Sequence, residues 1–300
     1  RYPLVTGVQT CALPIYRRTE RTLRVDQRTD DTTQQTSWFE LTRSDTIGVH
    51  DWVLGVSSAR EALDFAARPD LAYIRTQSGV FLTDSFSIPD DWSWQVAARY
   101  ETSQSLRLGS VRLAALHKLA PSTNLRFSIG RGDSAPNYDL DELADLGFGA
   151  LRGSRADRSE RASNASLDLD WKDEDLEIVV GVFHSKVEHL LDLRRTSDGR
   201  YDIVNAVDPL RVSGIEGVAR YAEGPWHVMA SWTRLWTQFG SAGVSRELPL
   251  TPRYTGELAM LYEVDRTWRA GLEFAFTGRQ QLDETGAPSA PSTCERSEEH

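Results

Sequence analysis

Cysteine, methionine and long apolar runs are all scarce in this sequence of 300 residues, which contains two cysteines and two methionines. Cys11 and Cys294 lie near opposite ends of the chain, so neither a disulfide framework nor a cysteine-based metal site is predicted. No apolar run approaches the roughly 18 residues of a membrane-spanning helix, which excludes a helical membrane protein. The apolar content of 40% still permits a membrane β-barrel, because strands that alternate lipid-facing and lumen-facing residues dilute their apolar residues.

An excess of positive charge is also absent, since 34 Lys and Arg residues against 44 Asp and Glu residues give a net charge of −10. The basic residues are scattered and are mostly arginines on the polar faces of predicted strands, so no nucleic-acid partner is expected. No Gly-x-Ser-x-Gly nucleophile motif occurs, and His184 and His189 would lie on opposite faces of a strand. We therefore predict no enzymatic activity, no metal site and no cofactor.

The clearest pattern is a twofold period that occurs twice between Thr251 and Arg279, with Asp265 and Arg266 between the two runs. Alternating residues are apolar in each run, which predicts two long strands of an antiparallel hairpin, each with one apolar face. The apolar sets are Tyr254, Gly256, Leu258, Met260, Tyr262 and Val264, followed by Trp268, Ala270, Leu272, Phe274 and Phe276. Such strands match the roughly 9 to 11 residues that cross a bilayer, whereas strands of a soluble sandwich usually have about 5 to 6.

The rest of the chain repeats this pattern and predicts about 13 strands in all. Short connections are expected near residues 45, 90, 122, 173, 224 and 265, and long ones near 65, 104, 145, 200, 245 and beyond 279. This alternation is typical of an up-and-down barrel with short turns on one rim and long loops on the other, and a Greek-key sandwich would not keep it. Nine tryptophans and nine tyrosines, gathered near strand ends as Trp92, Trp94 and Tyr100 are, indicate aromatic girdles.

Both ends of the chain match the translation of a common sequencing-library adapter. Val5 to Ile15 reads VTGVQTCALPI, and the last five residues, Arg296 to His300, read RSEEH. We therefore expect residues 1–16 and 295–300 to be artefacts of read-through, and residues 17–294 to be a partial barrel from a truncated gene.

Several phrases resemble the TonB-dependent outer-membrane receptors. They cover nearly all of residues 17–285, and their order and spacing agree with the family, although Asp157 stands where the family commonly has proline. The phrases are SIGRGDSAP from Ser128, RADRSERASNASLDLDW from Arg155, VFHSKVEHLL from Val182, DGRYDIVNA from Asp198, VSGIEGVARY from Val212, and the late hairpin LPLTPRYTGELAMLYE with WRAGLEFAFTGRQ.

The resemblance implies a 22-stranded antiparallel transmembrane barrel, of which this chain would supply about 13 strands as an incomplete, open sheet. It also implies an N-terminal plug, a periplasmic TonB partner and energised uptake of a scarce small ligand, such as an iron-siderophore or cobalamin, across the outer membrane of a Gram-negative bacterium. A fragment of this kind is expected to be inactive alone, because open sheet edges leave backbone groups unpaired in lipid. The alternatives are a passive porin-like or adhesin barrel and a soluble β-rich binding module.

Candidate ligand-binding residues are the charged residues that alternate with the apolar ones. Their side chains should point away from the apolar face and line the lumen. They are Arg99, Glu101, Glu257, Glu263, Arg269 and Glu273. A second group, Asp139, Asp141 and Glu142, lies in the aperiodic stretch from Gly130 to Arg161, where a long loop predicts function or disorder. This stretch lacks the glycine and terminal glutamate of a calcium loop, so a solvated acidic loop is the preferred interpretation.

Overall fold

The computed structural model describes residues 9–25, 28–66, 69–88, 91–136, 151–154, 156–240, 246–264, 268–281 and 293–299. These residues form an all-β structure whose one helix, η1, is a single short turn, and no helix in these ranges is long and apolar enough to cross a membrane. The elements are β1 (Gln9–Val25), β2 (Arg28–Ile47), β3 (His50–Phe65), η1 (Pro69–Leu71), β4 (Tyr73–Ser87), β5 (Trp92–Ser103), β6 (Leu106–Ala120), β7 (Thr123–Ser134), β8 (Leu151–Ser154), β9 (Glu160–Lys172), β10 (Leu176–Glu188), β11 (Leu191–Arg195), β12 (Tyr201–Asn205), β13 (Leu210–Glu223), β14 (Trp226–Phe239), β15 (Tyr254–Val264), β16 (Trp268–Thr277) and β17 (Thr293–Glu299).

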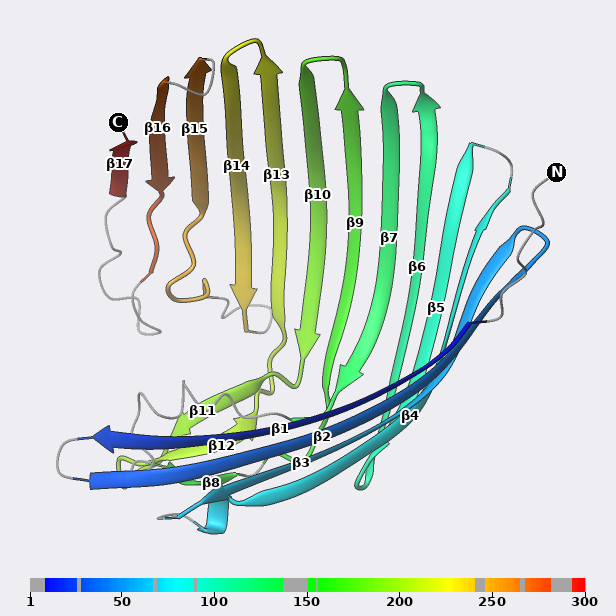
Figure 1. Cartoon of the computed structure of the whole chain (residues 1–300). Helices are drawn as coiled ribbons and strands as arrows, with labels where there is room; N and C mark the ends of the chain where they lie inside the picture. Colours follow the sequence, from blue (N-terminus) through cyan, green and yellow to red (C-terminus); the bar gives the residue numbers. More distant parts are fainter. Residues whose placement is uncertain are drawn as a thin grey trace.

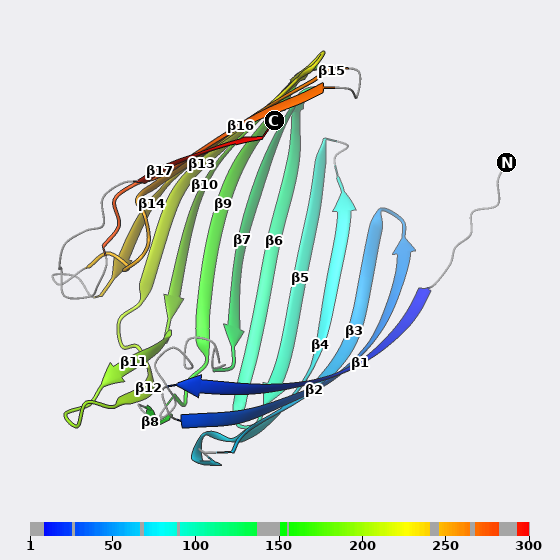
Figure 2. The same cartoon turned by 60° about the vertical axis from the view of Figure 1, so that its left-hand side comes forward.

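Fourteen strands form one antiparallel sheet in the order β1-β2-β3-β4-β5-β6-β7-β9-β10-β13-β14-β15-β16-β17. The sheet curls into a concave wall that does not close, with β1 and β17 at its two edges (Figures 1 and 2). All 13 strands predicted from the sequence are present, and β17 is the fourteenth. The predicted fold class, an up-and-down barrel wall that stays open, is confirmed.

The two faces of the sheet differ as the parity predicts. Leu258 lies opposite Phe274 and Met260 opposite Leu272, so the apolar sets of the late hairpin share one face. The same face carries exposed apolar side chains on the other strands, including Phe127 and Leu167 at 37% and 44% exposure. We call this the outer face, and the opposite, more polar one the inner face.

Aromatic residues mark the rim of the short turns. Trp226 packs against Tyr262 with ring centroids 4.6 Å apart, and Tyr262 against Trp268 at 5.7 Å. Trp236 lies ten residues beyond Trp226 on the same face of β14. With about 3.3 Å per residue and a tilt of about 40°, this separation corresponds to about 25 Å, the height of the apolar band of a membrane barrel.

Connections alternate in length as predicted, with one exception. The predicted long connection near residue 104 is wrong, because β5 and β6 are joined by a tight turn at Gln104 and Ser105. Gln104 adopts the left-handed conformation, with φ of 53°, that glycine or asparagine would normally signal. The sequence has neither residue at this position, so no local signal predicts the turn.

The first two strands are longer than predicted. The sequence places one strand at Thr19 to Arg28 and the next at about Thr33 to Thr42, whereas Arg28 already belongs to β2, which has 20 residues. The polar run between Thr32 and Ser37 has too little hydrophobic contrast to show a twofold period. Residues 9–16 pair with β2 as part of β1, and residues 295–299 pair with β16; their adapter origin stays a prediction.

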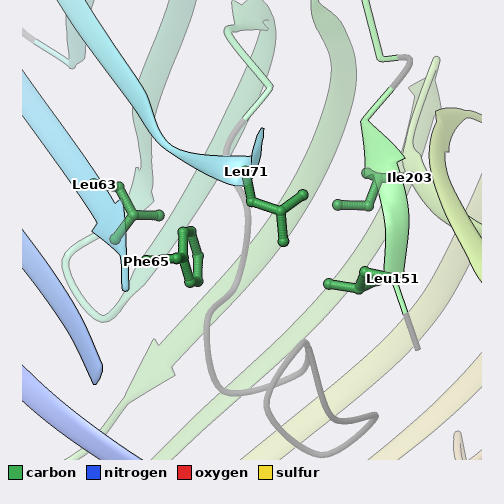
Figure 3. Packing of buried hydrophobic residues seen from close by; sticks show 5 residues of the cluster. All are labelled: Leu63, Phe65, Leu71, Leu151 and Ile203. Carbon is green, nitrogen blue, oxygen red and sulfur yellow. The ribbon is translucent and has the colours of Figure 1, made fainter. Parts of the chain in front are cut away.

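Two long connections build a second, three-stranded sheet, which we call the loop sheet, with the order β11-β12-β8. It lies beside the ends of β2, β3 and β4 in both views (Figures 1 and 2). A hydrophobic cluster joins it to the barrel wall: Leu63 and Phe65 of β3 and Leu71 of η1 meet Leu151 of β8 and Ile203 of β12 (Figure 3). All five are at most 5% exposed, so this apolar core lies between the barrel wall and the loop sheet.

Replacement of Phe65 by alanine should release the loop sheet from the wall. Loss of a buried phenylalanine side chain typically costs about 3 to 5 kcal/mol, and Phe65 lies in the cluster that joins the loop sheet to β3. Limited proteolysis should then cut the β11–β12 turn faster while the barrel strands stay protected. Phe39→Ala on the exposed outer face is the control, and equal cleavage of both variants would contradict the assigned packing.

Replacement of Leu272 by arginine tests the facing of β16. Leu272 lies on the outer face six residues above the short turn, near mid-depth, so the change should cost about 2 to 4 kcal/mol in a bilayer. Glu273→Arg, on the inner face, should cost much less. The free energies of unfolding in vesicles give the comparison, and equal losses would show that the faces are misassigned.

Candidate functional site

The inner face beneath the loop sheet carries a hydrogen-bonded polar ladder across β2, β3 and β4. Glu61 accepts hydrogen bonds from the Gln34 amide at 2.8 Å and from the Arg75 guanidinium at 2.5 Å. Arg75 also donates to the carbonyl oxygen of Pro136 at 2.5 Å. The Arg75 and Glu61 side chains are only 16% and 14% exposed, which makes their ion pair one of the better shielded in the wall. This ladder fixes the start of the loop that follows β7 to the wall of the barrel.

A second ladder extends this polar wall to β5 and contains two of the predicted residues. The Arg99 guanidinium donates to Glu101 at 2.5 Å and to Ser57 at 2.8 Å, and it lies over the Phe81 ring at 5.2 Å. Glu101 also accepts a hydrogen bond from the Gln77 amide at 2.8 Å. Arg99 and Glu101 therefore lie on the inner face, each held by several partners; their contact with a ligand stays a prediction.

Two glycines make room for the large side chains of Phe81 and Glu101 on the neighbouring strands. The Phe81 ring lies over Gly55, where a Cβ atom would come within 2.3 Å of the ring. Glu101 lies over Gly79, where a Cβ atom would come within 2.4 Å of its Cγ and 2.6 Å of the Tyr100 carbonyl oxygen. Glycine at the cross-strand position thus lets each long side chain lie flat along the wall.

The charges of this wall are balanced, because Arg75 pairs with Glu61 and Arg99 with Glu101. A balanced wall of amides, hydroxyls and ion pairs suits contact with a hydrated polar surface better than capture of a bare ion. Within the described ranges, no group of three or more His, Cys, Asp or Glu side chains could hold a metal ion. The arrangement can bind a partner by hydrogen bonding.

The remaining predicted lumen residues lie elsewhere on the inner face. Arg269 of β16 donates to Glu263 of β15 at 3.0 Å. Glu257 lies opposite Ala275 and Glu273 opposite Ala259, on the same face. Six strands separate β5 from β15 in the sheet, so the structure does not bring the two groups into one cluster. The loop candidates Asp139, Asp141 and Glu142 lie outside the described residues.

Sequence reasoning missed Gln34, Glu61, Arg75 and Gln77, although each alternates with the apolar residues of its own strand, which could have placed it on the inner face. It also placed Asp133 in a loop, whereas Asp133 is the penultimate residue of β7 and pairs with Arg161 of β9 at 2.7 Å.

Two charged groups in the loops have shifted pKa values. The Thr196 hydroxyl and the Arg200 guanidinium lower the pKa of Asp198, in the β11–β12 turn, to about 2. A hydrogen bond from Arg253 to Glu247, in the connection after β14, raises the pKa of Arg253. Both ion pairs are solvent-exposed and order the loops locally.

An antiparallel wall with an apolar outer face, a polar inner face and long loops on one rim is the architecture of barrels that span outer membranes. Residues 6–293 match the family described as TonB dependent receptor-like, beta-barrel. The chain belongs to the TonB-dependent receptor family, through the β-barrel region of that family.

Solved structures agree with this assignment. An apoprotein form of the FrpB iron transporter from Neisseria meningitidis is 12% identical, with a TM-score of 0.77 over 97% of this chain and 54% of that one. The copper transporter OprC is 15% identical, with a TM-score of 0.74 over 89% and 48%. The unliganded ferric citrate transporter FecA is 16% identical, with a TM-score of 0.68 over 96% and 50%. The chain thus spans about half the length of these transporters. Comparison with curated protein sequences gives no significant match.

Replacement of Gly79 by alanine should disturb the second ladder. The added methyl group would collide with the Tyr100 carbonyl oxygen and with Glu101, and overpacking of this kind costs about 1 to 3 kcal/mol. Gly109→Ala, on β6, is the matched control, because a Cβ atom there would meet nothing within 4 Å. Urea unfolding from vesicles measures both, and equal stabilities would show that Glu101 does not lie over Gly79.

Proposed function

We propose that this chain forms part of the barrel of an outer-membrane receptor that takes up a scarce small ligand, of the iron-siderophore or cobalamin type, with energy delivered through TonB. One observation carries the proposal: the chain belongs to a family of receptors, and its loop sheet packs against a barrel wall whose inner face is polar. A ligand that enters from the long-loop rim meets the loop sheet first and the wall next.

The chemistry of the wall supports a polar, hydrated ligand or a polar protein surface within the lumen. Arg75 pairs with Glu61, and Arg99 pairs with Glu101. A ligand or plug that contacts these pairs therefore exchanges hydrogen bonds without the cost of burying an unpaired charge. The named transporters carry iron, copper and ferric citrate, and we infer a cargo of similar scarcity here. Arg99 and Glu101 are the inner-wall residues we assign to contact with it; Glu257, Glu263, Arg269 and Glu273 are secondary candidates.

Dependence on TonB tests the proposal. Deletion of the gene that encodes this chain should abolish growth on one scarce-metal or cobalamin source, and deletion of the TonB gene should abolish the same growth, because uptake against a gradient requires energy. Radiolabelled ligand uptake measures both. Uptake that continues unchanged without TonB would favour a passive porin-like barrel and overturn the proposal.

A further inference from the structure

The outer face carries charged residues of both signs on β2, β3 and β4, close to the short-turn rim. The cross-strand register places Asp45 opposite Trp52 and Trp52 opposite Asp84. Arg43 lies two residues before Asp45 on the same face of β2, and His50 lies two residues before Trp52 on the same face of β3. We call Arg43, Asp45, His50, Trp52 and Asp84 the rim cluster.

The rim cluster interrupts a surface that is otherwise apolar. One row farther from the rim, Leu54 lies opposite Leu82, and the two side chains are 50% and 47% exposed. The corresponding outward residues of β9 and β10 are all aromatic or aliphatic, namely Trp171, Leu169, Ile178 and Val180. Polar groups on a face that meets lipid need polar partners, because hydrocarbon supplies none.

The height of the rim cluster places it where head groups of the lipid leaflet on the short-turn side lie. Trp52 follows His50, the first residue of β3, by two positions, and Asp84 precedes Ser87, the last residue of β4, by three. At about 3.3 Å per residue and a tilt of about 40°, they lie about 5 Å and 8 Å from the strand ends.

A row of aromatic rings beside the rim cluster marks the same level independently. Trp92 of β5 stacks on Trp94 at 5.3 Å and on His117 of β6 at 4.2 Å. Trp94 lies opposite Phe86 of β4, whose ring centroid is 4.9 Å from that of His50. Aromatic rings of membrane proteins gather at the interface between hydrocarbon and head groups. The rim cluster therefore borders this interface and not the middle of the bilayer.

The polar atoms of the rim cluster are only partly matched to one another. The Oδ2 atom of Asp84 lies 2.8 Å from Nδ1 of His50. Within the part of the chain that the structure describes, the Oδ1 atom of Asp84 and the indole nitrogen of Trp52 have no hydrogen-bond partner, although both atoms are shielded from solvent. An acceptor and a donor of this kind are costly to leave unpaired. The Asp84 side chain is 29% exposed, so rotation of its carboxylate can present Oδ1 at the surface.

We propose that the rim cluster binds the head group of a phospholipid that carries a primary ammonium, in the leaflet on the short-turn side. The ammonium donates hydrogen bonds to Asp84, and the phosphate accepts them from Trp52 and Arg43. The acyl chains of this lipid lie along Leu54 and Leu82. The inference rests on the membrane placement included in the proposed function, and it is independent of the cargo and of TonB.

Both charges of such a head group meet an opposite charge in the rim cluster. The Arg43 guanidinium lies over the Trp52 ring at 6.0 Å, and β3 separates it from Asp84 on β4. A phosphate near Arg43 and an ammonium near Asp84 therefore each form charge-assisted hydrogen bonds, which are about twice as strong as neutral ones. A head group without a cation leaves Asp84 unmatched, so the cluster should discriminate among phospholipids.

Native mass spectrometry of the full chain, folded in neutral detergent, tests this site with three phospholipids that share the same acyl chains. Phosphatidylethanolamine should be retained at least fivefold better than phosphatidylglycerol, which has no ammonium. It should also be retained better than phosphatidylcholine, whose ammonium carries no hydrogen to donate. Asp84→Asn should abolish the preference, because it removes the charge that the ammonium meets. Asp64→Asn, an exposed carboxylate near the long-loop end of β3, is the matched control and should keep it.

The outcomes separate the possible sources of binding. Equal retention of phosphatidylethanolamine and either other lipid, or a preference that survives in Asp84→Asn, would overturn the proposal. Complete displacement of the lipid by an equal concentration of free phosphoethanolamine would show a site for a soluble amine and would also overturn it. Circular dichroism confirms folding of each variant. If Asp84→Asn does not fold, Trp52→Phe decides, since it keeps the ring but should weaken lipid retention through loss of the indole N–H. Retention needs no TonB, so failure here leaves the uptake proposal intact, and failure of uptake leaves this one intact.

Discussion

The constraint on which the rest of this structure depends is that backbone groups facing hydrocarbon must be paired within the protein. Fourteen antiparallel strands satisfy it by an unbroken ladder, in which β7 pairs directly with β9 and β10 with β13, although long connections separate them in sequence. Those connections carry their own strands, β8, β11 and β12, out of the wall and into a separate sheet. The need to keep the ladder continuous therefore decides where irregular chain is allowed: on one rim, outside the apolar band.

A barrel wall of this kind has lipid on one side and water on the other, so its two faces have different requirements. The outer face needs only apolar bulk, so its side chains, such as Phe127 and Leu167, can remain exposed. The inner face must place charged groups close together, and it does so by pairing them, as Arg75 with Glu61 and Arg99 with Glu101. Because paired charges need room to lie flat, glycine appears opposite the larger side chains. Electrostatic balance and the placement of Gly55 and Gly79 are thus parts of one arrangement.

The sequence predicts well whatever depends on the twofold period and poorly whatever depends on distant packing. The hairpin of β15 and β16 was evident because one parity of each strand is almost wholly apolar, and the inner-face position of Arg99 and Glu101 follows from the same rule. The length of β2 was missed because its polar run between Thr32 and Ser37 has no contrast. The loop sheet could not be predicted, since Leu63, Leu151 and Ile203 come from three segments that no local pattern connects. The ladder around Arg75 was missed for a related reason: its partner Pro136 is 61 residues away.

The register also brings together basic residues that are scattered in the sequence. Arg131 and Arg211 lie on the outer, apolar parity, and the register brings them onto one row with Lys186. Both arginines lie toward the long-loop ends of their strands, whereas exposed apolar residues of the same face, such as Phe127, lie closer to the short turns. Facing is therefore set by the position of a residue in the twofold period, but the solvent it meets is set by its height above the turn. Residues scattered in the sequence become neighbours on one face only through the register across the strands, which no local pattern reveals.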